Sequence, residues 1–421
     1  MSEALDLLPQ AAELVAKDLA RGTKGSKAGR GGMSGEQVLR AVVLKQMHGW
    51  SYDDLAFHLA DSDTFRTFCR IGMMDECPKR SALADNIKRL KPATLESINR
   101  LIVGHAKNKG IEKGKKSRVD STVIDANIHH PLDSSLLFDV VRTLTRLLKK
   151  AKEELSLEIK YSNHIKRAKR RMLDIANARN MASRVPLYIE LLKITQWTMG
   201  YATEALPILA KVPQMQAYAI EEALRHYLAL GGKVVDQTQR RVIQEESVPA
   251  SEKIVSIFEE HTDVIVKDRR ATRYGHKVFL NVGASGMILD MVMERGNPND
   301  AARAVLMVER HCEIMGQAPK QAAFDAGFTS GANLDRVREL GVEDAYFARK
   351  GTIDVDKGVS SPRTRRKLSR FRAGVEGIIS FTKRCFGFGR CSWRGYSSFQ
   401  AYAWASVIST NLVLLARLST S

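Results

Sequence analysis

The chain has 421 residues, of which 44% are hydrophobic, an ordinary share for a globular protein of two or three domains or of one elaborated domain. Its 66 lysines and arginines outnumber 47 acids, and the formal net charge of +19 favours polyanionic partners. The five cysteines are scattered and form no Cys-x-x-Cys pair, which argues against zinc fingers and against a disulfide framework.

Membrane contact is not expected. No apolar run approaches the roughly 18–20 residues that cross a bilayer. The first residues show neither a basic leader nor a signal-type apolar core. These features predict a cytoplasmic protein.

The first third of the chain is predicted to be helical. A short amphipathic helix at about 3–20 precedes a Gly-, Ser- and Lys-rich stretch, so residues 1–35 are expected to form a helix and a basic linker. Ser34 and Gln37 resemble a capping box that opens the next helix. Residues 36–112 then predict short helices joined by tight turns, which suit a helix-turn-helix DNA-binding domain and a plain helical bundle equally well.

The pattern changes at Lys116. Residues 117–124 are rich in β-formers, and further strands are expected at 277–282, 287–293, 320–324 and 344–348. A long helical insertion at about 134–260 separates the first strand from the others. Without it, the order is strand, strand, strand, helix, strand, helix, strand, helix, helix. This order predicts a ribonuclease H-like mixed α/β sheet over 113–421, preceded by the all-helical N-terminal domain.

Two acids occupy strand positions that suit a metal site. Asp120 lies within the first strand, where alternation places it on one face with Thr122 and Ile124 and points Asp125 to the other. Asp325 follows an apolar strand and begins a Gly-containing turn, and ligand sites of α/β sheets gather at such strand ends. Asp120 could also be a strand-edge charge or a partner of Arg118. Asp325 could simply form the turn.

A third acid, Glu376, lies in the most basic part of the chain. Thirteen Lys or Arg and three acids fall between positions 349 and 394. Helical spacing places Arg372, Glu376 and Lys383 on one face. The simplest interpretation is an exposed i,i+4 ion pair, worth a few tenths of a kcal/mol. The alternative is a carboxylate held among phosphate-binding cations.

Mg²⁺ prefers oxygen ligands, and two-metal phosphoryl transfer uses a pair of ions held by carboxylates from separate elements. Asp120, Asp325 and Glu376 are therefore our candidate ligands and catalytic residues. Other acids remain in view, of which Asp125 is the strongest competitor. The further rivals are Asp133, read as a helix N-cap, and Asp263, Asp268 and Asp335.

The helical insertion carries a second basic cluster. The run of Lys166, Arg167, Lys169, Arg170 and Arg171 could be a solvated helix face, but its few neighbouring acids favour contact with a DNA backbone.

The combined motifs resemble insertion-sequence transposases of the DDE type, in the group whose acidic helix carries Tyr-x2-Arg-x3-Glu-x6-Lys. Arg372, Glu376 and Lys383 match that signature, whereas Ser369 stands at the tyrosine position. Four segments add to the resemblance, which covers about 117–395: Val119-Asp-Ser-Thr-Val123 followed by Ala126-Asn-Ile-His-His-Pro131, Gly275-His-Lys-Val-Phe-Leu280, Gly296-Asn-Pro298, and Asp325-Ala-Gly-Phe-Thr-Ser330.

The resemblance implies a transposase whose Asp120, Asp325 and Glu376 bind two divalent ions, Mg²⁺ or also Mn²⁺. Arg372 and Lys383 would hold phosphates beside them. The implied partners are double-stranded DNA, as terminal inverted repeats and as target, and a second copy of the chain in the synaptic complex, at the nucleoid. Ser369 cannot stack on a base, which leaves a hairpin pathway in question. Two alternatives remain: a catalytically silent DNA-binding regulator derived from a transposase, and another ribonuclease H-like nuclease.

Overall fold

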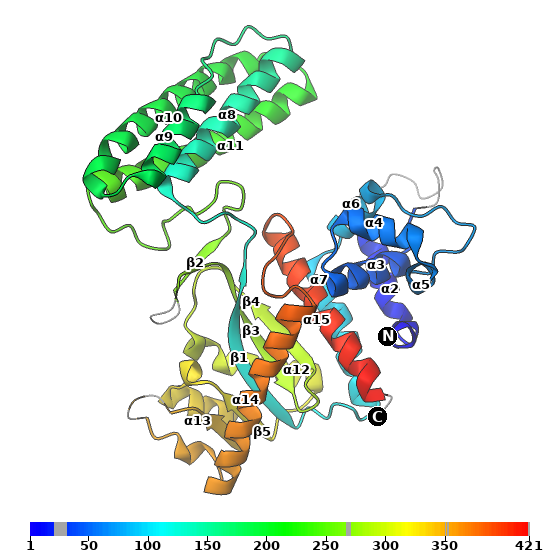
Figure 1. Cartoon of the computed structure of the whole chain (residues 1–421). Helices are drawn as coiled ribbons and strands as arrows, with labels where there is room; N and C mark the ends of the chain where they lie inside the picture. Colours follow the sequence, from blue (N-terminus) through cyan, green and yellow to red (C-terminus); the bar gives the residue numbers. More distant parts are fainter. Residues whose placement is uncertain (21–31, 267–270, 350, 352, 420–421) are drawn as a thin grey trace. The chain divides into compact units, whose positions relative to one another are not determined.

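The computed structural model describes residues 1–20, 32–266, 271–349, 351 and 353–419 (Figure 1). Two compact units make up the described chain: a sheet unit of Met1–Asn127 with Gly275–Ser421, and a helical unit of Ile128–Tyr274. Most of the predicted linker, residues 21–31, lies outside the described residues, as does the rival acid Asp268.

The sheet unit begins with short helices. Where one helix was predicted at 3–20, there are two, α1 (Ser2–Asp6) and α2 (Pro9–Ala20), because the residue before a proline disfavours helical geometry. The predicted capping box is confirmed: Ser34 and Gln37 exchange side-chain to backbone hydrogen bonds at the start of α3. The helices that follow are α3 (Gly35–His48), α4 (Tyr52–Asp61), α5 (Asp63–Phe68), α6 (Arg80–Lys88) and α7 (Pro92–Asn108).

A mixed sheet forms the centre of this unit, in which β4 and β1 both pair with β3 and the order continues from β1 to β5 and β6. β1 (Lys116–Asp125), β3 (Arg273–Gly283) and β4 (Ile288–Met293) pair antiparallel, whereas β5 (Gln321–Phe324) and β6 (Asp344–Phe347) continue the sheet in parallel with β1. This is the ribonuclease H-like sheet that the element order predicted. The helical insertion leaves after β1 and returns at β3.

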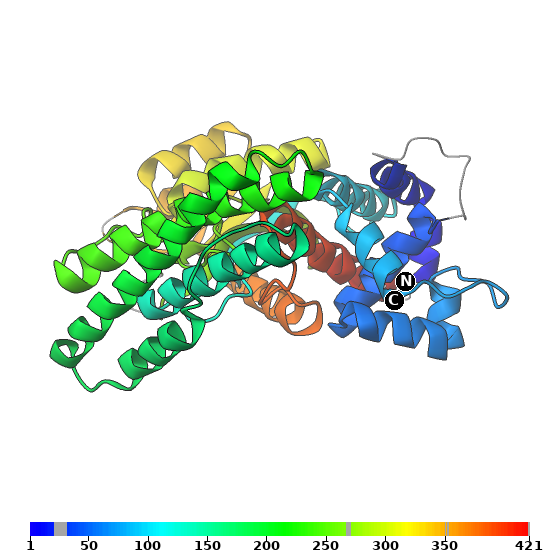
Figure 2. The ribbon, with the colours of Figure 1, turned by 90° about the horizontal axis from the view of Figure 1, so that it is seen from above.

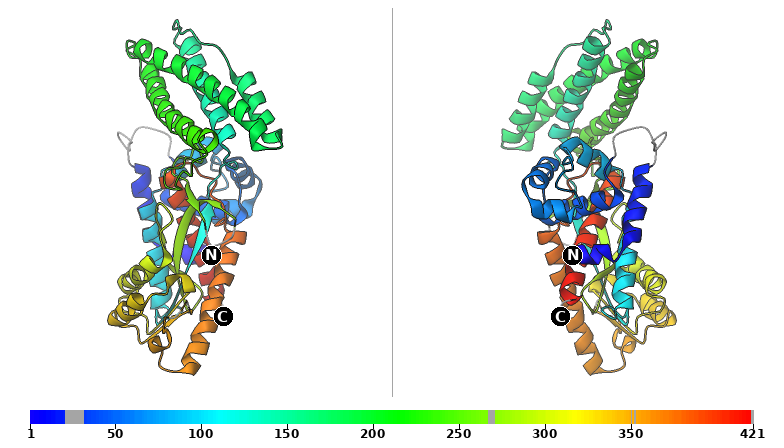
Figure 3. Two further views of the ribbon diagram at one scale, coloured as in Figure 1. Left: turned by 90° about the vertical axis from the view of Figure 1, so that its left-hand side faces the viewer. Right: turned by 90° about the vertical axis from the view of Figure 1, so that its right-hand side faces the viewer.

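Helices cover both faces of the sheet (Figure 3). α12 (Ala304–Met315) and α13 (Gly331–Glu339) pack on the face that carries Val119, Phe279 and Phe324. α14 (Pro362–Cys385) lies on the other face, where Leu368 packs with Ala323. Short 3₁₀ turns join these elements at η2 (Asp300–Arg303), η3 (Ala326–Phe328) and η4 (Asp356–Gly358).

The last helix, α15 (Tyr396–Ser419), ties the N-terminal helices to the sheet. Buried Asn411 donates to the side chain of Asn99 in α7 and exchanges hydrogen bonds with the backbone of Ile288 in β4, at 2.7–2.9 Å. Contrary to the sequence expectation, α15 is long and apolar enough to cross a membrane, but 78% of its apolar window is buried in the fold. It behaves as a core helix.

The helical unit contains α8 (Asp133–Glu154), α9 (Ile165–Asn177), α10 (Met181–Leu209) and α11 (Met215–Thr238), which run side by side around one aliphatic core (Figure 2). α11 ends in a π-helical turn, η1 (Gln239–Ile243), and the short strand β2 (Asp263–Ile265) follows later. The unit is wider than the predicted insertion of 134–260. The separation of residues 36–112 as a domain of their own stays a prediction.

Candidate active site

Asp120 and Asp325 occupy neighbouring positions on adjacent strands. β1 and β5 run parallel with Val119 opposite Phe324, and both chains continue in extended geometry to Asp120 and Asp325. Parallel strands lie about 4.8 Å apart, and residues in register point to the same face. The strand pairing therefore brings two acids together that are 205 positions apart in the sequence.

Asp120 is buried, and its Oδ1 accepts a hydrogen bond of 2.7 Å from the backbone N–H of Ser121. Asp325 lies just beyond the end of β5, with its side chain 37% exposed. The two strands thus supply one fixed carboxylate and one reachable from solvent.

The helix α14 contributes the third acid. Ser361 caps its start by accepting from the N–H of Thr364, and Pro362 occupies the first turn, where a missing N–H costs no bond. Leu368, Val375 and Thr382 recur every seven residues and form the buried stripe of the helix. Arg372 and Glu376 lie beside this stripe, and the carboxylate of Glu376 is 68% exposed.

Arg372 connects the helix to the strand end. Its Nη1 lies 3.0 Å from Oδ1 of Asp325, and its Nη2 lies 3.4 Å from Oε1 of Glu376. One guanidinium therefore holds two of the predicted catalytic carboxylates from two different elements. The i,i+4 pair expected from the sequence is present, but it is half of a three-residue arrangement.

The remaining signature positions also lie on α14. Lys383 follows buried Thr382 in the last turn and is half-buried. Ser369, at the tyrosine position, is half-buried one residue after Leu368.

The donor chemistry suits a divalent cation, because all three side chains offer hard oxygens. Within the described residues, however, no three His, Cys, Asp or Glu side chains converge closely enough to hold a metal ion. Arg372 supplies the positive charge between Asp325 and Glu376. The residues fit a metal by the chemistry of their oxygens, and Arg372 is the common partner of two of them.

Other acids prove structural. Asp290 is buried and receives both Nε and Nη2 of Arg310, at 2.5 and 2.8 Å, and these bonds raise the pKa of Arg310. Asp300 accepts from Lys277 at 2.9 Å and from Ser121 at 3.0 Å on the face of β1 opposite Asp120. Their oxygens are engaged in holding elements together.

The rival acids have separate surroundings. The backbone of Asp125 bonds to Gly389 and Cys391 at 2.8–3.0 Å, so this residue anchors the segment after α14. Asp335 is exposed on α13, and Asp263 begins β2 in the helical unit. Neither element contributes to the group formed by Asp120, Asp325 and Glu376.

Arg118, expected from the sequence only as a partner for Asp120, contacts α14. Arg118 lies two positions before Asp120, on the same face of β1. Its Nη1 donates to the carbonyl oxygen of Phe371 at 2.9 Å, and its guanidinium lies 4.7 Å from the centre of the Phe371 ring. The position of Arg118 two residues before Asp120 predicts that both side chains lie on one face of β1. It does not predict that Arg118 contacts Phe371 on α14.

The basic run of the helical unit divides into two groups. Arg167 and Arg171 both bind Glu190 of α10, at 2.5–2.9 Å, and Arg171 also binds Asp174. Lys166, Lys169 and Arg170 are exposed on α9, with no ion pair to another described residue. Two cations therefore fasten α9 to α10, and three face solvent.

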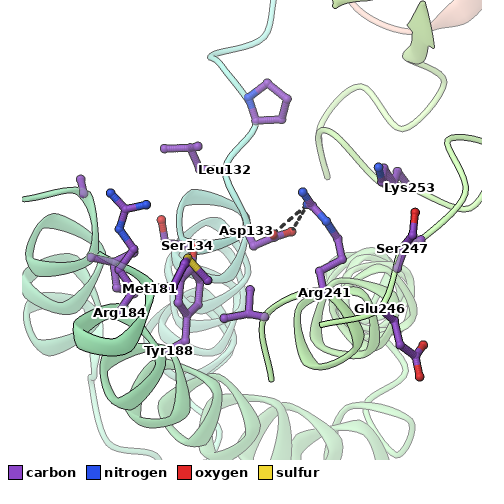
Figure 4. Close-up of a pocket in the computed structure, with 15 residues that line it drawn as sticks. Leu132, Asp133, Ser134, Met181, Arg184, Tyr188, Arg241, Glu246, Ser247 and Lys253 are labelled. Carbon is purple, nitrogen blue, oxygen red and sulfur yellow. Dashed lines mark hydrogen bonds and ion pairs between the residues drawn. The ribbon is translucent and has the colours of Figure 1, made fainter. Parts of the chain in front are cut away.

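A pocket of about 570 Å³ lies wholly within the helical unit (Figure 4). One wall carries Asp133, whose carboxylate binds Arg241 at 2.8 and 3.0 Å. Asp133 is thus the first residue of α8 and part of an ion pair, which corrects its interpretation as an N-cap. Tyr188 lines the same pocket, and burial raises its pKa. None of the three predicted catalytic acids lines this pocket.

Two family models match the chain. One, described as a transposase DDE domain, matches residues 248–412, which include Asp325 and Glu376 but not Asp120. The other, described as a transposase domain, matches residues 2–89. Searches of curated proteins and of solved structures gave no match.

Proposed function

The chain belongs to the insertion-sequence transposases with a DDE domain, and we propose that it cuts and joins DNA strands at the ends of its mobile element by metal-dependent phosphoryl transfer. One observation carries this proposal: Arg372 contacts both Asp325 and Glu376, while the pairing of β1 with β5 sets Asp120 beside Asp325. The proposal also assigns the chain to the group of transposases whose signature residues are matched here by Arg372, Glu376 and Lys383.

In this mechanism Asp120, Asp325 and Glu376 would hold two divalent ions, Mg²⁺ or Mn²⁺. When bound, such ions lower the pKa of an attacking hydroxyl and stabilise the leaving oxygen. Asp120 is held by the strand and by its bond to Ser121, so it fixes one side of the site. Glu376 and Asp325 are more exposed and complete the ligand set from the helix and the strand end.

The reaction has two displacements. The oxygen of water attacks a phosphodiester at the element end, and the bond from phosphorus to the 3′ oxygen breaks, which frees a 3′-hydroxyl. That hydroxyl then attacks a phosphodiester of the target and releases a target 3′-hydroxyl. Arg372 and Lys383 would hold the phosphates, with Arg372 exchanging a carboxylate for a phosphate oxygen, a group its planar fork also binds.

The partners follow from this role. Double-stranded DNA is the substrate, both as terminal inverted repeats and as target, and Lys166, Lys169 and Arg170 are exposed to contact its backbone. Arg167 and Arg171 support them through Glu190. Bringing two ends together calls for a homodimer in the complex, and we place this activity in the cytoplasm, at the nucleoid.

The test uses the full chain, Mg²⁺ and linear DNA with the inverted repeats that flank the coding region. We expect strand cleavage at the repeat ends, reduced more than about 100-fold by Asp120→Asn, Asp325→Asn or Glu376→Gln, because loss of even an outer partner of a metal ligand costs about 10–100-fold. Asp335→Asn, an exposed rival acid on α13, is the matched control and should cleave normally.

Persistent cleavage by Glu376→Gln would overturn the assignment of the third acid. End binding without cleavage by the wild type would instead identify a silent regulator. Cleavage of branched DNA or RNA irrespective of the repeats would identify a different ribonuclease H-like nuclease.

A further inference from the structure

Two glycines interrupt the interior of α14, at positions 374 and 377. Glycine is the least favourable residue in a helix interior apart from proline, so each calls for a reason. The space around the two positions differs. A Cβ at Gly377 would meet nothing within 4 Å, whereas a Cβ at Gly374 would lie 2.2 Å from Nη1 and 3.3 Å from Cζ of Arg118.

The group that fills the space at Gly374 is a nearly buried guanidinium. Arg118 is 8% exposed, and burial lowers its pKa. Its Nη1 is fixed by the carbonyl of Phe371 and its plane by the Phe371 ring. Its Nε finds no hydrogen-bond partner among the described residues. Burying a cation in this way costs free energy, and an apolar side chain at position 118 would cover the helix at a lower free-energy cost.

The contact between Arg118 and Gly374 lies next to the proposed active site. On β1, Arg118 shares a face with Asp120 two residues later. On α14, Arg372 and Glu376 stand two residues before and two residues after Gly374. A single contact between strand and helix thus lies between the acid of β1 and the acid of α14.

We propose that Arg118 and Gly374 are positioning residues: the guanidinium packs into the gap left by the missing side chain and sets how closely, and in which rotation, α14 rests on β1. Glu376 and Arg372 take their places relative to Asp120 and Asp325 from this contact. The inference rests on the proposed function, because it assigns the contact to the same site.

The experiment compares Gly374→Ala with Gly377→Ala in the full chain. Both substitutions add one methyl group to the same helix three residues apart. Gly374→Ala should lower the rate of end cleavage at saturating DNA by about 10- to 100-fold, because small displacements of catalytic groups cost on this order. The DNA concentration at half-maximal rate should stay the same. Gly377→Ala should cleave at the wild-type rate.

Rescue separates positioning from general damage. Arg118→Lys removes the Nη1 that the added methyl would strike, so the double variant Arg118→Lys with Gly374→Ala should cleave about tenfold faster than Gly374→Ala alone. Equal rates for Gly374→Ala and Gly377→Ala would overturn the proposal, as would a double variant no faster than the single one.

The wild type, the two single variants at positions 118 and 374 and their double variant are also unfolded in urea, a measurement independent of catalysis. We expect the shift of the unfolding midpoint in the double variant to differ from the sum of the shifts in the two single variants. Additive shifts would show that the residues at positions 118 and 374 do not interact. A wild type that never cleaves would refute the proposed function, and the urea series would still decide whether the contact holds α14.

Discussion

The two units combine arginines and carboxylates in different arrangements. In the helical unit, two arginines, Arg167 and Arg171, surround one carboxylate, that of Glu190. In the sheet unit, one arginine, Arg372, lies between two carboxylates, those of Asp325 and Glu376. Arg171 also binds Asp174, so the first group balances two arginines with two carboxylates. In the second group two carboxylates share one guanidinium, so neither has an arginine to itself.

Geometry sharpens this difference. Glu190 uses both carboxylate oxygens, at 2.5–2.9 Å, and its side chain is 27% exposed. Asp325 and Glu376 each meet Arg372 with one oxygen, at 3.0 and 3.4 Å, and are 37% and 68% exposed. Close, two-oxygen pairing is what fastens helices together, whereas long, one-oxygen contacts can be exchanged. Three predictions test the comparison.

The largest effect is expected for Arg372→Gln. Removing the guanidinium leaves two neighbouring carboxylates without their cation, so the affinity for Mn²⁺ in the absence of DNA should rise about tenfold, since a shift of some 1.4 kcal/mol is modest for charges in contact near a surface. Calorimetric titration measures this, with Arg171→Gln as the control of unchanged affinity. A weaker Mn²⁺ affinity in Arg372→Gln would show that this arginine supports the metal site instead of competing with the ion.

The exposed cations of α9 should govern affinity for DNA of any sequence. Replacing Lys166, Lys169 and Arg170 together by Gln should reduce the slope of log affinity against log salt by about 0.9 for each DNA phosphate that these cations neutralise. Fluorescence anisotropy over a salt series gives that slope. The double variant Arg167→Gln with Arg171→Gln should change this slope less. It should lower the unfolding midpoint instead, because Glu190 is then left without either arginine. A larger change of slope for the Arg167 and Arg171 double variant than for the triple variant would show that these two arginines, and not the exposed cations, contact the DNA.

The smallest effect concerns pH. The hydrogen bond from Arg167, followed by that from Arg171, lowers the pKa of Glu190 below its usual value near 4.5, against the effect of burial. The carboxylate thus stabilises the folded state above that value, and the contribution is lost as pH falls through the lower, folded-state pKa. It should amount to less than about 1 kcal/mol. Urea unfolding between pH 6 and 3.5 should show a shallower loss for Glu190→Gln than for the wild type; equal losses would contradict the assignment.

Local patterns predicted the elements of the sheet unit well. The first strand, expected at 117–124, spans Lys116–Asp125, and the strand ending at Phe324 places Asp325 where the sequence analysis put it. These elements are bounded by glycines, prolines and apolar runs, whose effects are local. The capping residue Ser34 belongs to the same class, because a cap acts within one helical turn.

Contacts between distant segments could not be predicted in this way. The bond of Arg118 to Phe371 spans 253 positions, and that of Arg171 to Glu190 depends on how two helices pack. The composition of a helix indicates which side chains are available, and only packing decides which of them remain exposed.

The register between β1 and β3 has a consequence for the architecture of the chain. Asp125 stands opposite Gly275, and the strands approach so closely there that a Cβ at Gly275 would lie 1.9 Å from the carbonyl oxygen of Ile124. Antiparallel strands that meet in this way need only a two-residue hairpin to be joined. The helical unit is thus inserted where a tight turn would suffice, and β1 and β3 keep their antiparallel register across the insertion.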